Sequence, residues 1–393
     1  MRTRLVLGIA AVLAITLLSG CSGAAPAAER TPTASDPATP SPTPTPTPTD
    51  PVADFVETRM SELSLEQKAA ALLMLHAPGL DPAPLRSLVE QGASGLILMG
   101  DNVPGTPEEL AALTAATQVD PELPPLVAID EEGGDVQRLP WDTAPGAEAL
   151  RAEPPSATTD AFAARAATLA ASGVNLNFGI VADVTDDPDS FIWSRVLGTD
   201  PASAGERVAA AVTGEHGTVF STLKHFPGHG AAPGDSHSSV PSAPLALDEW
   251  NAGPALPFAA GIDAGSEFVM TGHLAYPAVD PIPASLSPEW HRILREELGF
   301  DGVVVTDDML MLGANGLPEY ADPNENAIRA VASGADLLLY VLPADPADVG
   351  ISVDGLVGAI AGAVTSGRIP QARLDDAVER VLTLRRTLVE ESS

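Results

Sequence analysis

The sequence is poor in cysteine and in positive charge. Its 393 residues include one cysteine, Cys21, and 20 Lys and Arg against 53 Asp and Glu, which gives a net charge of −33. A single cysteine cannot form an intramolecular disulfide, so the core alone must hold the fold together. The shortage of basic residues argues against nucleic acid as a partner, because phosphate binding needs clustered Lys and Arg. The patterns GxGxxG and GxxxxGK(S/T) are also absent, which leaves nucleotide binding without support.

The first twenty residues have the composition of a targeting segment. Two arginines precede an uncharged apolar run from Leu5 to Leu18. This run is shorter than the roughly 20 apolar residues of a membrane span, so it predicts a signal peptide over residues 1–20; an uncleaved anchor helix is the alternative. Leu18 to Cys21 resembles the lipobox of bacterial lipoproteins. That resemblance implies a lipidated Cys21 and a protein exported and anchored to the outer face of the cytoplasmic membrane.

A segment rich in Thr and Pro follows over residues 21–53. It cannot bury much apolar surface, and its prolines favour an extended polyproline conformation. We therefore expect a stalk between the lipid anchor and a single folded domain over residues 54–393.

Short apolar runs alternate with segments of helical composition along this domain. Eight runs have the character of strands: Ala70–Leu75, Gly95–Met99, Leu126–Ile129, Val174–Phe178, Val219–Leu223, Phe268–Met270, Gly302–Val305 and Leu337–Val341. Helical patterns fill several of the intervals: Ala161–Ala171, Pro201–His216, Pro288–Leu298 and Asn324–Ala332. Continuous apolar strands separated by helices are typical of a parallel sheet covered by helices. Eight such units predict an α/β fold of the (β/α)8 TIM barrel type.

Polar side chains follow these apolar runs closely. They are His76, Asp101, Asn102, Asp130, Asp183, Lys224, His225, His273, Asp307 and Asp308. In a (β/α)8 barrel the C-terminal ends of the strands share one rim, where such barrels place their active sites. The sequence therefore predicts a polar site at this rim.

The densest group of ionisable residues is the segment KHFPGHGAAPGDSH, residues 224–237. It holds three of the seven histidines, and its glycines and prolines exclude a helix. Three interpretations are open: a solvated loop that happens to contain histidine, a zinc site of His225, His229 and His237, and an acid/base pair of Asp235 and His237. Zinc ligands usually follow a regular spacing that this loop lacks. In the acid/base interpretation, a local turn lets Asp235 orient the imidazole and stabilise its protonated form.

Two other strand ends carry acids. Asp307 and Asp308 follow the apolar run Gly302–Val305, and successive side chains of a strand point in opposite directions, so one of the two should face the site. We expect this to be Asp307, with Asp308 stabilising the following turn; helix capping is the alternative role for such an aspartate. After another strand, Asp130 and Arg138 flank a pair of glycines and carry groups suited to hydrogen bonds with hydroxyls.

Seven segments together resemble glycoside hydrolase family 3, and within it the β-N-acetylhexosaminidase branch. In chain order they are GASGLILMGDN (92–102), IDEEGGDVQRL (129–139), NLNFGIVADV (175–184), SRVLGTDP (194–201), KHFPGHG with DSH (224–237), MTGHLAYP (270–277) and GFDGVVVTDDML (299–310). They span nearly the whole domain, and the Asp-x-His pair of the fifth segment is the most specific of them.

The resemblance implies a single (β/α)8 catalytic domain that removes terminal β-linked N-acetylglucosamine from muropeptides or chito-oligosaccharides, without a metal or organic cofactor. The family's nucleophile falls on Asp307, and its acid/base on His237, oriented by Asp235. Its sugar-binding positions fall on Asp130, Arg138, Arg195, Lys224 and His225. Asp135 departs from the pattern, because the family usually has a basic residue after the glycine pair.

Two other functions stay open at this point. A histidine as acid/base repels phosphate less than a glutamate would, which leaves room for a phosphorylase that transfers the sugar to phosphate. A catalytically silent, sugar-binding surface lipoprotein is the alternative from a different class. In each case we expect a monomer that binds a small GlcNAc-containing carbohydrate and contacts the membrane only through its lipid anchor.

Overall fold

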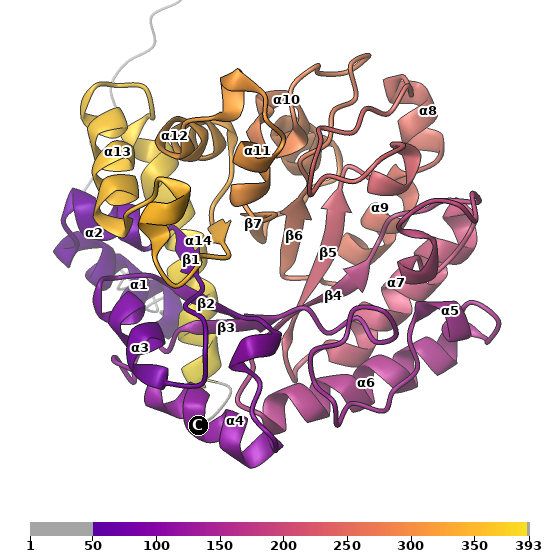
Figure 1. Cartoon of the computed structure of the whole chain (residues 1–393), viewed down its shortest axis with the longest axis horizontal. Coiled ribbons are helices and arrows are strands. Elements are labelled where there is room, and N and C mark those ends of the chain that lie inside the picture. Colours follow the sequence, from indigo (N-terminus) through magenta and orange to yellow (C-terminus); the bar gives the residue numbers. More distant parts are fainter. Residues whose placement is uncertain (1–49, 391–393) are drawn as a thin grey trace, which may run out of the picture. The chain divides into compact units, whose positions relative to one another are not determined.

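The computed structural model describes residues 50–390, which fold around a barrel of eight parallel strands (Figure 1). The strands are β1 Leu73–Leu75, β2 Gly95–Leu98, β3 Leu126–Ile129, β4 Leu176–Val181, β5 Phe220–Phe226, β6 Phe268–Thr271, β7 Val303–Thr306 and β8 Leu338–Tyr340. Hydrogen-bonded neighbours follow the order β7-β6-β5-β4-β3-β2-β1-β8, and a parallel bridge between Val305 and Leu337 joins the two outer strands. The predicted (β/α)8 barrel is confirmed, and every predicted apolar run overlaps one strand.

A helix follows each strand and packs on the outside of the barrel (Figure 1). In chain order these helices are α3 Pro82–Glu90, α4 Pro107–Ala116, α6 Pro155–Ala171, α7 Pro201–Glu215, α9 Ala255–Asp263, α10 Pro288–Arg292, α12 Pro323–Ser333 and α13 Val353–Thr365. All four predicted helical segments are helical, the third as α10 followed by a π-helical turn, Ile293–Glu297. Shorter helices lie in the loops: α5 Ala147–Leu150, α8 Leu247–Ala252 and α11 Leu310–Ala314.

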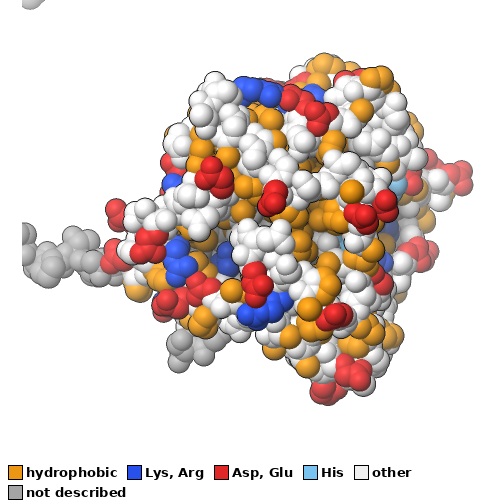
Figure 2. All heavy atoms as spheres, turned by 60° about the vertical axis from the view of Figure 1, so that its left-hand side comes forward, with side chains coloured by type: hydrophobic (Ala, Val, Ile, Leu, Met, Phe, Trp, Pro, Cys, Tyr) orange, Lys and Arg blue, Asp and Glu red, His pale blue; other side chains and the backbone are white. Residues whose placement is uncertain are grey.

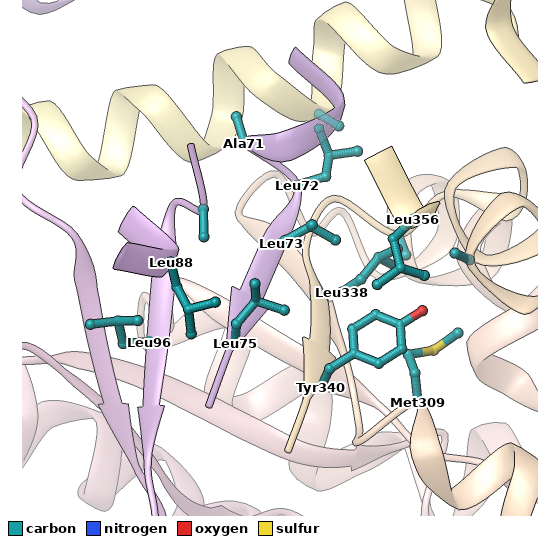
Figure 3. Packing of buried hydrophobic residues seen from close by; sticks show 14 of the residues in the cluster. Ala71, Leu72, Leu73, Leu75, Leu88, Leu96, Met309, Leu338, Tyr340 and Leu356 are labelled. Atoms are coloured by element: carbon teal, nitrogen blue, oxygen red, sulfur yellow. The ribbon is translucent and has the colours of Figure 1, made fainter. Parts of the chain in front are cut away.

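Side chains of each strand alternate between the barrel interior and the helix layer. In β3, Leu126 and Ala128 pack inside the barrel, whereas Val127 and Ile129 pack against helices. This alternation follows from the pleat of a strand. Figure 3 shows the helix-facing side chains at the junction of β1 and β8, where Leu73 and Leu75 lie beside Leu338 and Tyr340.

The last helix, α14 Gln371–Glu390, closes the N-terminal end of the barrel. Its Val381 packs with the inward side chains of the strands. The buried guanidinium of Arg385 donates to the carbonyl oxygens of Leu123 and Pro124 and to Oγ of Ser94, which lie just before β3 and β2. A ligand therefore has to enter the barrel from the opposite rim, formed by the carboxyl ends of the strands.

Helix α1, Pro51–Glu62, begins inside the segment that the sequence assigns to the stalk. Oδ1 of Asp50 accepts hydrogen bonds from the backbone N–H groups of Val52 and Ala53, at 3.0 and 3.3 Å. An Asp cap followed by Pro at the first helical position is a strong helix start, which the proline-rich composition around it obscured. The helix is followed by α2, Leu65–Ala70, and both pack against α14.

The predicted signal peptide, Cys21 and the rest of the predicted stalk lie outside the described residues. Among residues 50–390, no helix combines the length and the apolar character that crossing a membrane requires.

Candidate active site

A cavity of about 250 Å³ opens at the carboxyl rim of the barrel. Seven of the predicted site residues line it: Asp130, Arg138, Arg195, Lys224, His225, His237 and Asp307. They come from the segments that follow β3 and β4, from β5 and its loop, and from the end of β7. The eighth, Asp235, contacts His237. The fold thus brings together side chains that are spread over more than half of the described chain.

Asp307 presents an ionised carboxylate to the cavity. Its Oδ1 accepts a hydrogen bond of 2.8 Å from the backbone N–H of Asp308. Burial raises the pKa of Asp307, but the neighbouring His225 and His273 lower it. The charge of Lys224 acts in the same direction, and the pKa lies below its usual value. This carboxylate is therefore available as a nucleophile at neutral pH.

The adjacent Asp308 holds the turn after β7, as the sequence predicted. Its Oδ1 accepts hydrogen bonds from the backbone N–H groups of Leu310 and Val341, both at 3.1 Å. It thereby ties the start of α11 to the segment that follows β8. Burial, together with the nearby charge of Asp307, raises the pKa of Asp308 to about 6. Two neighbouring aspartates thus differ in protonation behaviour because their surroundings differ.

The loop after β5 brings His237 to the mouth of the cavity. Nδ1 of His237 lies 2.5 Å from Oδ1 of Asp235, and the His237 backbone N–H donates to the same oxygen at 3.0 Å. The predicted local turn between the two residues is therefore present. The His237 side chain is 67% exposed, so Nε2 is free to exchange a proton with a molecule in the cavity.

A chain of buried ion pairs forms another part of the wall. Nζ of Lys224 lies 2.7 Å from both Oδ1 of Asp130 and Oε1 of Glu132. Glu132 also accepts two hydrogen bonds from the Arg195 guanidinium, at 2.9 and 2.7 Å. Burial raises the pKa of Glu132, but the charges of Lys224 and Arg195 outweigh it and lower the pKa to about 2. One carboxylate therefore positions both cations.

Glu132 is not among the site residues predicted from the sequence. It lies two residues after Asp130 in the same acidic turn, and the two expected cations, Lys224 and Arg195, needed a buried partner. The need of two buried cations for an acidic partner could have pointed to such a residue, but which acid is the partner depends on the fold.

Glu132→Gln is expected to lower the free energy of unfolding by about 3 kcal/mol. Breaking a buried ion pair from one side leaves an uncompensated charge, which costs roughly 3–5 kcal/mol, and Lys224 retains Asp130. Urea unfolding measures the change, and the KM for an aryl glycoside should rise several-fold because the cations lose their orientation. The exposed Glu62→Gln is the matched control and should change neither quantity. Equal stability of the two variants would contradict the role of Glu132.

Asp183 orients the histidine of β5. Its Oδ2 lies 2.7 Å from Nδ1 of His225, and its Oδ1 accepts a 2.5 Å hydrogen bond from the His229 backbone N–H. Nε2 of His225 then lies 3.5 Å from the Arg195 guanidinium, at the cavity wall. The sequence placed Asp183 at the rim without a role. Among the described residues, no group of three or more His, Cys, Asp or Glu side chains is arranged to hold a metal ion, so the zinc interpretation gains no support from them.

Buried polar groups support the loop that carries Asp130. Oδ1 of Asn177 accepts a hydrogen bond of 3.2 Å from the Glu131 backbone N–H, and Nδ2 of Asn177 donates to Oε1 of Glu215 at 2.5 Å. Burial raises the pKa of Glu215 to about 8 and that of Glu131 to about 7. Both carboxyl groups therefore stay protonated at pH values well above those at which a solvent-exposed glutamate ionises.

Glu215→Gln is expected to be more stable than the wild type in alkaline solution. The unfolded chain releases the Glu215 proton near pH 4.5, whereas the folded protein holds it up to about pH 8. Stability is therefore lost progressively as pH rises from about 4.5 to about 8. Glutamine has no proton to lose and still accepts the Asn177 hydrogen bond. Urea unfolding at pH 5, 7 and 9 should show that the free energy of unfolding of the variant exceeds that of the wild type by an amount that grows with pH and then levels off. A difference that does not depend on pH would contradict this prediction.

The chain is similar to known proteins in both sequence and fold. The family model described as Glycosyl hydrolase family 3 N terminal domain matches residues 64–384. A β-hexosaminidase of Stenotrophomonas maltophilia (strain K279a) is 36% identical over 271 residues, which cover 65% of this chain and 78% of that protein.

Two solved structures are also similar. A glycoside hydrolase family 3 β-N-acetylglucosaminidase from Paenibacillus sp. str. FPU-7 has 34% identity and a TM-score of 0.75, over 84% of this chain and 63% of that one. A β-N-acetylhexosaminidase from Beutenbergia cavernae DSM 12333 has 32% identity and a TM-score of 0.71, and the match covers 82% of this chain and 99% of that one. The present chain thus spans less than two thirds of the Paenibacillus enzyme and nearly all of the Beutenbergia one.

Proposed function

The chain belongs to glycosyl hydrolase family 3 and is a glycoside hydrolase of the β-N-acetylhexosaminidase kind, and on this premise we propose that it is a retaining, exo-acting β-N-acetylglucosaminidase. One observation carries the proposal. Asp307, His237, Lys224 and Arg195 line a single cavity, and Asp235 contacts His237 from outside it. Retaining hydrolysis of a glycoside needs a nucleophile for the anomeric carbon and a group that donates and then accepts a proton.

The reaction has two steps. In the first, Asp307 attacks the anomeric carbon, the glycosidic bond breaks, and the proton on Nε2 of His237 passes to the leaving oxygen. In the second, His237 takes a proton from water, which attacks the anomeric carbon and releases the Asp307 carboxylate. Asp235 stabilises, through its contact with Nδ1, the imidazolium form that His237 has before the first transfer and regains after the second.

The remaining residues hold the terminal sugar. Lys224 engages Oδ1 of Asp130, which leaves the second oxygen of that carboxylate for a hydroxyl. Arg138 lines the cavity, and a guanidinium group carries N–H donors suited to sugar hydroxyls. The cavity volume of about 250 Å³ lies below the roughly 300–1,000 Å³ of sites for drug-sized ligands, which suits a single monosaccharide.

The test is a panel of 4-nitrophenyl β-glycosides of GlcNAc, GalNAc, glucose and xylose, followed by chitobiose and purified muropeptides. We expect GlcNAc to be released fastest, and NMR to show the β-anomer as the first product. A sugar 1-phosphate formed only in phosphate buffer would instead identify a phosphorylase. Sugar binding without turnover of any glycoside would identify a silent binding protein.

We also propose that the enzyme is exported, anchored through Cys21, and acts as a monomer on muropeptides or chito-oligosaccharides outside the cell. The support is the pattern of residues 1–20 and the Thr- and Pro-rich segment that follows. Cys21→Ala should move the protein from the membrane fraction to the soluble fraction of the producing bacterium and leave its activity on 4-nitrophenyl N-acetyl-β-D-glucosaminide unchanged. Retention of the variant in the membrane fraction would refute lipidation at Cys21.

A further inference from the structure

His273 is a buried histidine beside the nucleophile, and neither of the two reaction steps uses it. It lies two residues after β6 and is 1% exposed. Its Nε2 lies 2.9 Å from the backbone carbonyl oxygen of Asp308, and its Nδ1 lies 2.7 Å from Oγ of Ser285. A carbonyl oxygen can only accept a hydrogen bond, so Nε2 of His273 carries a proton and donates it to this contact.

The hydroxyl group of Ser285 fixes this tautomer. Burial outweighs the nearby charge of Asp307 and lowers the pKa of His273, so the ring is neutral at neutral pH. A neutral ring with its proton on Nε2 has a bare Nδ1, which accepts a hydrogen bond from the Ser285 hydroxyl. Ser285 is itself fully buried, and its backbone N–H donates to the carbonyl oxygen of Gly272 at 3.2 Å. Both nitrogens of the imidazole are therefore held in place.

The backbone of Asp308 links this histidine to the nucleophile. Its carbonyl oxygen accepts from His273, and its N–H donates to Oδ1 of Asp307 at 2.8 Å. The Asp307 backbone N–H donates in turn to the carbonyl oxygen of Thr271, at the end of β6. A rotation of the main chain at Asp308 would turn its N–H away from Oδ1 and leave its buried carbonyl oxygen without a donor. The contact with His273 opposes that rotation.

The two carboxylate oxygens of Asp307 therefore differ. Oδ1 accepts the hydrogen bond from Asp308, whereas no described residue donates to Oδ2. Oδ2 nevertheless keeps accessible surface, and Asp307 lines the catalytic cavity, so this oxygen is open to the substrate. An attacking atom has to approach within about 3–3.5 Å with its lone pair aligned, and a misplacement of about 1 Å can cost about 10²-fold in rate. Holding Oδ1 in place sets the direction of Oδ2.

We propose that Oδ2 of Asp307 is the oxygen that attacks the anomeric carbon, and that His273, held by Ser285, is the positioning residue that aims it. An electron pair of Oδ2 forms the new bond, and the leaving oxygen takes the electron pair of the glycosidic bond together with the proton of His237. His273 neither gives nor takes a proton in this step. The role rests on the glycosidase function proposed above and adds to it the groups that orient the nucleophile.

Three substitutions test the contacts. His273→Phe keeps a ring without an N–H, Ser285→Ala removes only the hydroxyl, and His273→Gln supplies an amide N–H that can still reach the Asp308 carbonyl. We expect kcat/KM for 4-nitrophenyl N-acetyl-β-D-glucosaminide to fall by about 10²-fold in His273→Phe, and by about tenfold or less in the other two variants. The inhibition constant of N-acetylglucosamine should stay unchanged, because neither His273 nor Ser285 lines the cavity.

Ser266→Ala is the matched control for the serine. Ser266 is also buried, and its Oγ donates to the carbonyl oxygen of Phe268 at 3.1 Å, but it precedes β6 and so lies at the opposite end of the barrel. This variant should keep the kcat/KM of the wild type. A Tm measurement on each variant confirms that it is folded.

Azide separates the aiming of Asp307 from a general disturbance of the site. In Asp307→Ala the anion replaces the carboxylate as nucleophile, so adding His273→Phe should leave the azide-dependent rate within about twofold. Figure 2 shows acidic side chains spread over the surface, and the net charge is −33, which repels an anion. The assay is therefore run in about 1 M salt, where the Debye length is about 3 Å.

The outcomes are distinct. If His273→Phe lowers the azide-dependent rate as much as it lowers kcat/KM in the presence of Asp307, His273 maintains the site as a whole and does not aim the nucleophile. Unchanged kcat/KM in both His273→Phe and Ser285→Ala would also overturn the positioning role, while the glycosidase function would stand. Absence of turnover by the wild type would overturn both.

Discussion

Replacing Asp307 by asparagine should reduce the kcat for 4-nitrophenyl N-acetyl-β-D-glucosaminide by on the order of 10⁴-fold or more. The side chain keeps its size, and its amide oxygen can still accept the hydrogen bond from the Asp308 backbone N–H. The substitution therefore removes the charge that attacks the anomeric carbon with little change in structure. Steady-state kinetics of the purified variant, with a Tm measurement to confirm folding, checks the result.

The neighbouring Asp308→Asn is the matched control. Asparagine retains the oxygen that holds Leu310 and Val341, and the Asp308 carboxyl group, with a pKa of about 6, is already neutral in mildly acidic solution. We expect less than a tenfold loss of kcat below pH 6. If Asp307→Asn and Asp308→Asn lose similar activity, Asp307 is not the nucleophile.

Azide provides an independent check of the same assignment. In Asp307→Ala the anion can enter the space of the missing carboxylate and attack the anomeric carbon from that face. The product should then be the α-configured glycosyl azide, because only one inversion has taken place. A β-configured azide would show that another residue forms the covalent intermediate.

Replacing His237 by alanine should have an effect that depends on the leaving group. Chitobiose needs a proton on its departing oxygen, so its kcat/KM should fall by about 10²–10⁴-fold. A 2,4-dinitrophenyl glycoside departs without a proton, and its kcat/KM should fall by less than tenfold. Because kcat/KM reports the first step here, the comparison isolates the donation of the proton.

Two further variants complete this test. Asp235→Asn keeps a neutral acceptor beside Nδ1 of His237. Because Asp235 acts only through the histidine, we expect kcat/KM for chitobiose to fall by only about tenfold in this variant. Replacing the exposed His216 by alanine should leave kcat/KM unchanged for both substrates. A loss in His237→Ala that is equal for both leaving groups would show that His237 does not donate the proton.

The eight strands could be predicted because parallel strands buried on both faces have continuous apolar sequences. Strand β5, which the sequence ended at Leu223, continues to Phe226. Lys224 and His225 have polar side chains that composition assigns to a loop, yet both are buried in the strand. Their burial depends on Glu132 and Asp183, which belong to other parts of the chain.

Within the site, the interactions between residues close together along the chain could be predicted from the order of the residues. Asp235 and His237 lie two residues apart, so a single turn brings them into contact. Asp307 and Asp308 directly follow β7, and adjacent side chains at the end of a strand point in different directions, which separates their roles.

The pairings between distant segments, and the electrostatic environments that follow from them, depend on how the barrel folds. Arg195 reaches Glu132 across 63 positions, and the separate pKa values of Asp307 and Asp308 depend on charges from β5 and on burial. The physical reason is that burial and Coulomb interactions depend on distance in space, and the closure of the barrel sets those distances.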